Sequence, residues 1–288
     1  MKFGLCLTPI YPQAIQDCTL LERLIERLRD QKFFQCVELY FEGTQEERNR
    51  IRGILENTGL EAVYLGGLPI KRDAVDISAR DERVRKESVD ACKRHIEYAA
   101  CMGCGKIVIG SGPDWKRPGC EEQIAEQTRK SLEELDCCAE GMKLEISVEP
   151  FPSKTEPCLA VGNTHLVWKI FYDSQFHNVG LTFDTSHFRQ MQEDIEKSFH
   201  LLQPWIHHVH LANCVMKDKN NPLYGDKHPC FSQEGGEFTV ESIGSFYRKL
   251  EKQGMLTQVD ICSLEIISRK KEDWYYREAC QEAEMIWG

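Results

Sequence analysis

Four apolar segments of the chain end in, or close to, a residue that can bind a metal ion or transfer a proton. Each segment is a run typical of a β-strand, and the polar residue follows it abruptly. Carboxylate and imidazole groups suit hard to borderline divalent cations. The segments and their polar residues are 143–150 with Glu149, 178–187 with Asp184, 206–212 with His210 and 260–266 with Glu265.

These polar endings can be explained in two ways. A single acidic residue after a strand is usually a turn residue or the N-cap of a helix. Four such endings, on strands that alternate with helices, are harder to assign to turn chemistry. We therefore predict that the four residues form one shared metal site. His187, three residues beyond Asp184, follows the same strand and brings an imidazole to that end.

Strand-like and helix-like segments alternate along the whole chain. Eight β–α units in 288 residues, with polar residues at the strand ends, predict an α/β protein with a (β/α)8 TIM barrel fold. In such a barrel the site lies at the C-terminal ends of the strands. No linker or low-complexity segment divides the chain, so residues 1–288 are expected to form a single domain. The predicted strands are 2–8, 34–41, 60–66, 105–110, 143–150, 178–184, 206–212 and 260–266.

Three connections between these units are long enough to carry function. Residues 67–79 and 213–238 are predicted loops, and Thr239 is the expected N-cap of the helix that follows the second loop. The loop 111–119 contains Trp115. Two readings of this side chain stay open: an aromatic residue packed within its loop, or a wall over a sugar-like ligand.

The overall composition excludes several classes of protein. The formal net charge of −10 argues against a partner that is a nucleic acid, which requires a basic surface. No apolar run approaches the length of a membrane span, and the N-terminus lacks the regions of a signal peptide. We therefore expect a cytoplasmic protein that does not bind membranes.

The cysteine content is high, at fourteen residues. Cys101 and Cys104 form a CxxC motif, which also occurs in redox and zinc sites. No second Cys or His pair at zinc spacing accompanies the motif. We therefore predict reduced, inert thiols that pack as small hydrophobic groups on the face opposite the site.

The order of these motifs resembles the xylose isomerase-like TIM-barrel superfamily, which contains sugar phosphate isomerases and epimerases. The resemblance covers nearly the whole chain. The ordered set Glu, Asp-x-x-His, His, Asp-x-His, Glu is specific to the superfamily but not to one substrate. Its marks here are SVEPF around Glu149, LTFDTSH around Asp184 and His187, HHVHLAN around His210, GDKHP at 225–229 and SLEI around Glu265.

The resemblance to ketose 3-epimerases implies specific roles for these residues. In those enzymes one divalent ion, commonly Mn, Co or Mg, is held by residues that match Glu149, Asp184, His210 and Glu265, and the two glutamates act as acid and base. Zn is also an open choice here. Glu156 lies about where the epimerases place a second acidic contact to the sugar, with spacing that differs by one residue. Where they place an arginine after the histidine of strand seven, this chain has Lys217 and Lys219.

The related abasic-site endonucleases need two further histidines, on earlier strands. This chain has Gly66 with Gly67, and Ser111 with Gly112, at those places, so DNA cleavage is not expected. A further group resembles the residues that hold another zinc in those enzymes. It could bind a second metal or hydrogen-bond substrate hydroxyls, and we favour hydrogen bonds. This group is His187, Asp226 and His228.

The resulting hypothesis is a metal-dependent sugar isomerase or epimerase that transfers a proton next to the carbonyl of a ketose or related polyol, through an enediolate. One glutamate would remove the proton and the other would return one. An inosose-type dehydratase and a non-catalytic sugar-binding barrel that retains the metal site are the alternatives. The identity of the sugar, its phosphorylation and a homo-oligomeric state are left open.

Overall fold

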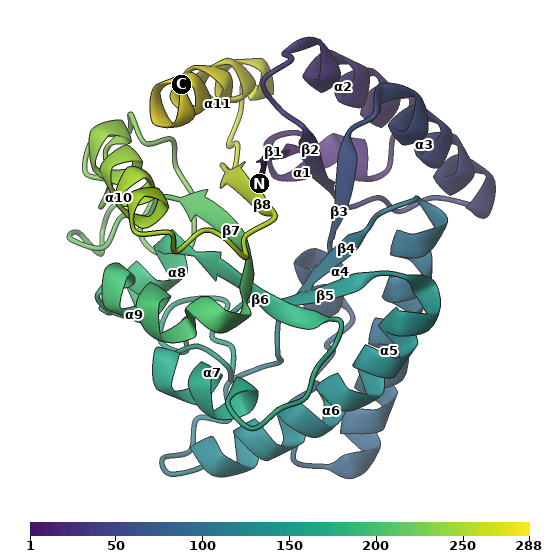
Figure 1. Cartoon of the computed structure of the whole chain (residues 1–288), viewed down its shortest axis with the longest axis vertical. Coiled ribbons are helices and arrows are strands. Elements are labelled where there is room, and N and C mark those ends of the chain that lie inside the picture. The colour runs from purple at the N-terminus through teal and green to yellow at the C-terminus, as the bar shows by residue number, and fades with distance from the viewer.

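A ring of eight parallel strands forms the centre of the molecule. The computed structural model describes every residue from Met1 to Gly288. Each strand pairs with the next, and the last pairs with the first, which closes the sheet into a barrel (Figure 1). The predicted (β/α)8 fold is therefore confirmed. The strands are β1 (Lys2–Cys6), β2 (Cys36–Leu39), β3 (Glu61–Leu65), β4 (Lys106–Ile109), β5 (Glu145–Val148), β6 (Val179–Asp184), β7 (Ile206–Ala212) and β8 (Ile261–Glu265).

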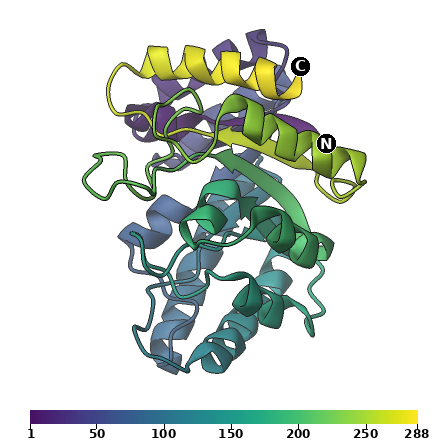
Figure 2. The same cartoon turned by 90° about the vertical axis from the view of Figure 1, so that its left-hand side faces the viewer.

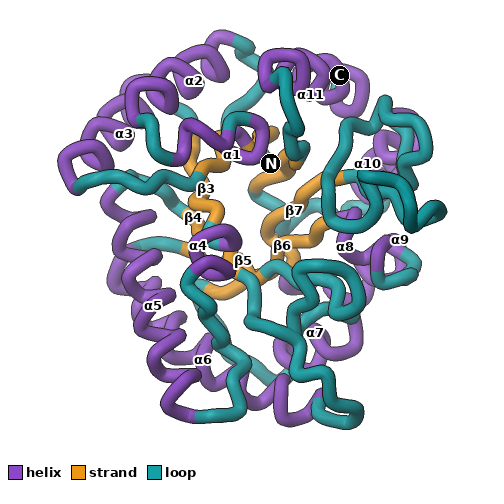
Figure 3. Tube along the Cα trace, turned by 180° about the vertical axis from the view of Figure 1, so that it is seen from behind, coloured by secondary structure: helices purple, strands orange, loops and turns teal.

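Helices surround the barrel, as the tube view from behind shows (Figure 3). The helix α11 packs against α10, and its C-terminal end places the last residue of the chain at the periphery (Figure 1). The helical elements are α1 (Leu7–Ile10), η1 (Pro12–Ile15), α2 (Cys18–Asp30), α3 (Gln45–Thr58), α4 (Gly67–Arg72), α5 (Glu82–Cys101), α6 (Glu121–Met142), α7 (Thr164–Phe171), α8 (Thr185–Gln190), α9 (Ile195–Leu202), η2 (Gln203–Trp205), α10 (Val240–Lys252) and α11 (Glu272–Trp287).

One continuous hydrophobic core joins the strands to the helices. It contains 72 buried residues, from Leu5 at the start of the chain to Ile286 at its end, so both termini belong to the same core. Side chains cap the N-termini of seven helices, which are α2, α3, α5, α7, α8, α9 and α10. The predicted N-cap Thr239 accepts a hydrogen bond from the Ser242 amide, a contact worth about 1 kcal/mol.

The strand register brings the polar strand ends together. Asp184 on β6 is the direct neighbour of His210 on β7, and Ala212 on β7 is the neighbour of Glu265 on β8. Because parallel strands in a barrel all point the same way, their C-terminal ends meet at one mouth. Glu149 directly follows β5 at the same mouth.

Several predicted strands extend one or two residues too far at this mouth, and one predicted loop contains a helix. The predicted strand 2–8 ends at Cys6, because Leu7 begins the short helix α1. The predicted loop 67–79 contains the helix α4, whose Pro69 and Ile70 are buried. By contrast, β7 has the predicted bounds.

The connection between β7 and α10, residues 213–238, is a long loop, as predicted. In Figure 2 this loop, in green, extends sideways from the body of the barrel. The amide of Ser232 in this loop donates a hydrogen bond of 2.7 Å to Oε1 of Glu282 on α11, which ties the loop to the barrel wall. None of the helices combines the length and the apolar character that crossing a membrane requires.

Candidate functional site

The four residues predicted to share a metal site lie together at the C-terminal mouth of the barrel. One ligand atom from each of them lies within 4.8 Å of the others. The imidazole of His210 is central: its Nδ1 is 3.1 Å from Oε1 of Glu149 and 3.2 Å from Oε2 of Glu265. The same nitrogen is 4.0 Å from Oδ2 of Asp184. Three carboxylates therefore face one imidazole nitrogen in a buried space.

Asp184 is a helix N-cap, one of the two explanations considered for such a residue, and it also keeps one carboxylate oxygen without a partner. Its Oδ1 accepts hydrogen bonds from the amides of Ser186 (2.7 Å) and His187 (2.9 Å), so it is the N-cap of α8. Its Oδ2 is buried and has no hydrogen-bond partner. The helix cap thus fixes the carboxylate and leaves one oxygen facing the cluster.

Several buried polar atoms in this cluster lack hydrogen-bond partners. They include Oδ2 of Asp184, Oε2 of Glu265 and Nδ1 of His228. Oε2 of Glu265 and Nδ1 of His228 are 3.2 Å apart, but they do not form a hydrogen bond with each other or with another group. A buried polar atom left in this state costs about 1–3 kcal/mol, which a bound cation or a ligand would offset. The donor set and its unpartnered oxygens therefore fit a divalent metal ion.

The predicted second group lies beside the first. Asp226 accepts from both histidines: its Oδ1 is 3.1 Å from Nε2 of His187 and 2.7 Å from Nε2 of His228. The Nδ1 atoms of both histidines are buried and unpartnered. The ring of His187 packs against Phe151, with the ring centres 4.2 Å apart. Asp184, His187 and His228 also lie close enough to hold an ion together, so the arrangement is compatible with either a second metal or hydrogen bonds to a ligand.

The surroundings of Glu149 and Glu265 shift the pKa values of these two side chains in opposite directions. Burial raises the pKa of Glu149, although the nearby His210 opposes this shift. Burial would also raise the pKa of Glu265, but the charges of His228 and His210 outweigh burial and hold this pKa well below its usual value. Burial would lower the pKa of His187, but the charges of Asp184 and Asp226 raise it to about 9.

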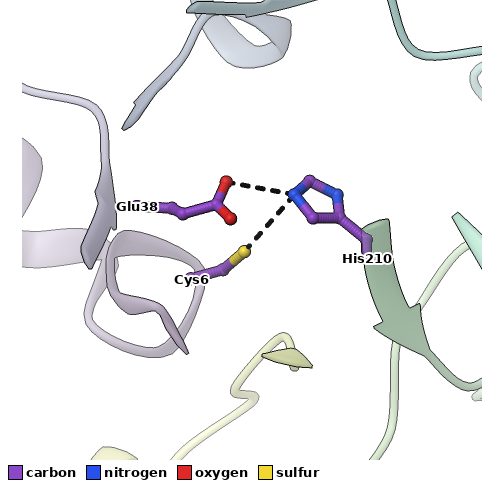
Figure 4. Close-up of side chains that lie close together, drawn as sticks. All are labelled: Cys6, Glu38 and His210. Carbon is purple, nitrogen blue, oxygen red and sulfur yellow. Dashed lines mark hydrogen bonds and ion pairs between the residues drawn. The ribbon is translucent and has the colours of Figure 1, made fainter. Parts of the chain in front are cut away.

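A glutamate that the sequence analysis did not identify supports His210 from behind. Glu38 lies in the middle of β2 and is fully buried. Its Oε2 is 3.0 Å from Nε2 of His210, and its Oε1 is 2.8 Å from Nε2 of His208 (Figure 4 shows the contact with His210). With Nε2 held by Glu38, the ring presents Nδ1 to the three carboxylates. Histidines that bind metals commonly have such an outer carboxylate, which fixes the tautomer and the orientation of the ring.

Cys6, Glu38 and His210 also approach one another closely enough to be considered as metal ligands. Figure 4 shows Cys6 and Glu38 on the same side of the His210 ring. Both oxygens of Glu38 already have imidazole partners, and Sγ of Cys6 is 3.9 Å from Nε2 of His210. We therefore interpret this group as the support of His210.

A cavity of about 560 Å³ opens above the cluster. The site residues Glu149, Glu265, His187, Asp226 and His228 line this cavity. Its volume is within the range of cavities that bind small molecules.

Three predicted substrate-binding residues do not line this cavity. Trp115 is half-buried and packs against the hydrophobic core, in agreement with the packed-loop reading. Glu156 and Lys217 are exposed to solvent on their loops. On the wall near Glu156, the neighbouring Pro157 lines the cavity instead. All three residues lie on loops, whose course sets the positions of their side chains. The geometry gives no support for contacts of these three residues with a ligand in the cavity.

The strand ends where the abasic-site endonucleases need histidines have no imidazole here. Gly66 directly follows β3, and Ser111 lies two residues after β4. The Ser111 hydroxyl accepts a hydrogen bond from the Val161 amide and supports a loop.

The CxxC cysteines are remote from the site. Cys101 ends α5, and Cys104 precedes β4 at the opposite end of the barrel. Both thiols are free, as predicted. Burial raises the pKa of Cys104 to about 12, so its thiol is inert.

Comparisons with known proteins agree with this architecture. The family model described as "Xylose isomerase-like TIM barrel" matches residues 27–284. No curated protein matches the sequence.

Among solved structures, the chain is similar to a D-tagatose 3-epimerase-like protein, with 20% identity, a TM-score of 0.73 and coverage of 99% of this chain and 98% of that one. It is also similar to an L-ribulose 3-epimerase (17% identity, TM-score 0.72, coverage 99% and 91%). A third similar structure is the IOLI protein with a bound zinc atom (19% identity, TM-score 0.69, coverage 99% and 96%). At these identities the likeness establishes the fold.

Proposed function

Because the chain belongs to the xylose isomerase-like TIM-barrel family, we propose that it is a divalent-metal-dependent sugar isomerase or epimerase. The observation that carries this proposal is the pair Glu149 and Glu265, which reach the same nitrogen of His210 from β5 and β8. Two of the similar structures are ketose 3-epimerases or resemble one by name, and a third contains zinc. These names support the proposed class of reaction.

The metal would be held by Glu149, Asp184, His210 and Glu265. When bound, a divalent ion supplies positive charge that stabilises negative charge developing on substrate oxygens. Manganese, cobalt and magnesium suit this oxygen-rich set, and zinc is also compatible with it.

The side chains of the protein would transfer the protons and hold the site in place. Glu149 and Glu265 are the proton-transfer groups: one carboxylate takes a proton from a carbon next to the carbonyl, and the other returns a proton. Return to the opposite face of that carbon inverts it, and return to the neighbouring carbon isomerises the sugar. Glu38 is a positioning residue, which holds His210 in place.

His187, Asp226 and His228 are proposed to bind substrate hydroxyls. Asp226 engages Nε2 of both histidines, and this leaves the two Nδ1 atoms, both unpartnered, for a ligand in the cavity. Imidazole nitrogens can donate to or accept from a hydroxyl according to their protonation.

Incubation with candidate substrates in deuterated buffer tests the function. The set contains unphosphorylated ketohexoses and ketopentoses, their phosphates and inosose-type cyclic ketones, each with Mn, Co or Mg. We expect deuterium at one carbon of at least one candidate, and about one divalent ion per chain by elemental analysis. Tight binding of one sugar without exchange in any of them would instead support a binding protein. Net loss of water from an inosose would identify a dehydratase.

A further inference from the structure

The wall of the cavity has two chemically distinct parts. Its polar part is the group of five site residues described above, which contact one another at short range. One series of contacts runs from Glu149 through His187 (3.6 Å) and Asp226 (3.1 Å) to His228 (2.7 Å) and on to Glu265 (3.2 Å). Most of the remaining wall is apolar. Its larger side chains include Ile15, Leu65, Leu68, Ile70, Leu159 and Ile267.

Few hydrogen-bonding side chains interrupt the apolar part, which we call the apolar wall. They are Thr8, Lys71 and Ser268. The Thr8 hydroxyl is fully buried and already accepts a hydrogen bond of 3.1 Å from the Tyr40 amide. Lys71 is exposed at the rim. A free sugar has hydroxyls along its whole length, and each one placed against this wall without a partner would cost about 1–3 kcal/mol.

The helix α4 gives a second observation. It contributes both Leu68 and Ile70 to the wall, and Leu68 remains 50% exposed in the protein alone. Large apolar side chains with this much exposure are few on this molecule. One of them at the mouth of the cavity is placed where a bound apolar group would cover it.

The charges of the lining argue against a phosphorylated substrate. Three carboxylates, from Glu149, Asp226 and Glu265, face the cavity. The two imidazoles of the lining, His187 and His228, are already paired with Asp226, and Lys71 is the one lysine or arginine among the lining residues. Phosphate sites usually combine several cationic or backbone donors. An anionic group on the apolar wall would therefore have only Lys71, at the rim, as a lysine or arginine partner.

We infer that the substrate is a keto-sugar, or a similar polyol ketone, that carries an uncharged apolar substituent such as an aromatic or alkyl aglycone. This inference rests on the proposed function. The polyol part binds at the five polar residues, where its reacting carbon meets Glu149 and Glu265. The substituent lies against the apolar wall, where burial of a phenyl-sized group adds affinity through the hydrophobic effect.

A matched pair of substrates tests the inference: the 3-keto derivatives of phenyl β-D-glucoside and methyl β-D-glucoside, with Mn in deuterated buffer. We expect kcat/KM for deuterium exchange to be at least about 10-fold higher for the phenyl compound, equivalent to about 1.4 kcal/mol. Leu68→Ser should reduce this phenyl-to-methyl ratio. Leu201→Ser is the matched control, because Leu201 on α9 is 48% exposed and lies outside the cavity lining.

The possible outcomes separate this inference from the proposed function. Exchange in both compounds at equal rates, or in unsubstituted sugars only, would overturn the inference and leave the proposed function intact. A ratio that Leu68→Ser does not change would also overturn it. If neither compound exchanges, calorimetric binding of phenyl and methyl β-D-glucoside decides: tighter binding of the phenyl compound supports the inference, and equal or absent binding contradicts it.

Discussion

The strands β5 and β7 pair a glutamate with a histidine at both ends of the barrel. At the N-terminal end, Oε1 of Glu145 is 2.9 Å from Nδ1 of His207. At the C-terminal end, Oε1 of Glu149 is 3.1 Å from Nδ1 of His210. The same two side-chain types, on the same two strands, thus occur in two settings.

The surroundings of the two pairs differ in charge balance. The N-terminal pair is joined by the buried ammonium of Lys106, which is 2.9 Å from Asp260 and 3.4 Å from Glu145. Two carboxylates there face a lysine and a histidine. The C-terminal pair lies beside three further carboxylates, from Glu38, Asp184 and Glu265, and beside the imidazole of His187, with no lysine among these contacts.

The two groups also differ in the number of buried polar atoms that lack a hydrogen-bond partner. The N-terminal group contains no buried side-chain atom without a hydrogen-bond partner, whereas the C-terminal group contains several. A network that satisfies itself contributes to folding, and one that remains unsatisfied costs stability until a ligand completes it. This difference agrees with the proposal that the C-terminal group binds a cation and a substrate.

The largest expected effect is the difference in activity between two Glu→Gln substitutions, one at Glu149 directly after β5 and one at Glu145 at its start. Glu149→Gln should lower the rate of deuterium exchange by about 10²–10⁴-fold, because it removes a proton-transfer group, and it should reduce the bound metal. Glu265→Gln should act likewise. Glu145→Gln, four residues earlier, should leave both quantities near wild type. Elemental analysis and exchange kinetics check this, and equal effects of Glu149→Gln and Glu145→Gln would remove the functional distinction between the two ends.

The sequence predicted this difference only in part. The four metal-site residues could be found because each lies at or near the end of an apolar run, and the position of a residue in a strand determines which mouth it reaches. The helix α4 could not be predicted, because its six residues are too few to show helical periodicity and Gly67 and Pro69 are typical of turns. The surroundings of Trp115 and Lys217 could not be predicted for a related reason: both residues lie on loops, and no periodic pattern in the sequence records the path of a loop.

Glu38 was missed although a signal was present. A glutamate in the middle of the apolar segment FQCVELYF must have a buried partner. The partner, His210, is 172 residues away in sequence, and spacing along the chain cannot reveal it. Only the closure of the barrel brings β2 and β7 side chains into contact across its interior.

The next expected effect concerns this positioning residue. Glu38→Gln should raise the dissociation constant for Mn by about 10–100-fold, because His210 loses the carboxylate that fixes its orientation. Competition with a chelator measures this constant without any activity assay. Glu145→Gln is again the control, since it changes the carboxylate that contacts His207 at the other end. A dissociation constant for Glu38→Gln equal to that of the wild type, in protein shown to be folded by its Tm, would contradict the positioning role.

The smallest expected effect is a pH dependence of stability at the N-terminal end. Burial alone would raise the pKa of Glu145, but the hydrogen bond with His207 and the charge of Lys106 outweigh burial and lower it. A carboxyl group whose pKa is lower in the folded state stabilises the protein above its unfolded pKa, which is about 4.3 for glutamate. This stabilisation is lost as the pH falls through the folded pKa, because the protonated group no longer pairs with Lys106 and His207.

Urea denaturation of the wild type and Glu145→Gln between pH 6 and pH 3 measures this contribution. The difference in the free energy of unfolding between the two proteins should be largest near pH 5–6 and should narrow as the pH falls below about 4. Other carboxyl groups titrate over the same range in both proteins, and their contributions cancel in the difference. A difference that stays constant down to pH 3 would mean that the ion pairs of Glu145 add nothing to folding. The N-terminal network would then be explained by hydrogen bonding alone, and charge balance would no longer distinguish the two ends of the barrel.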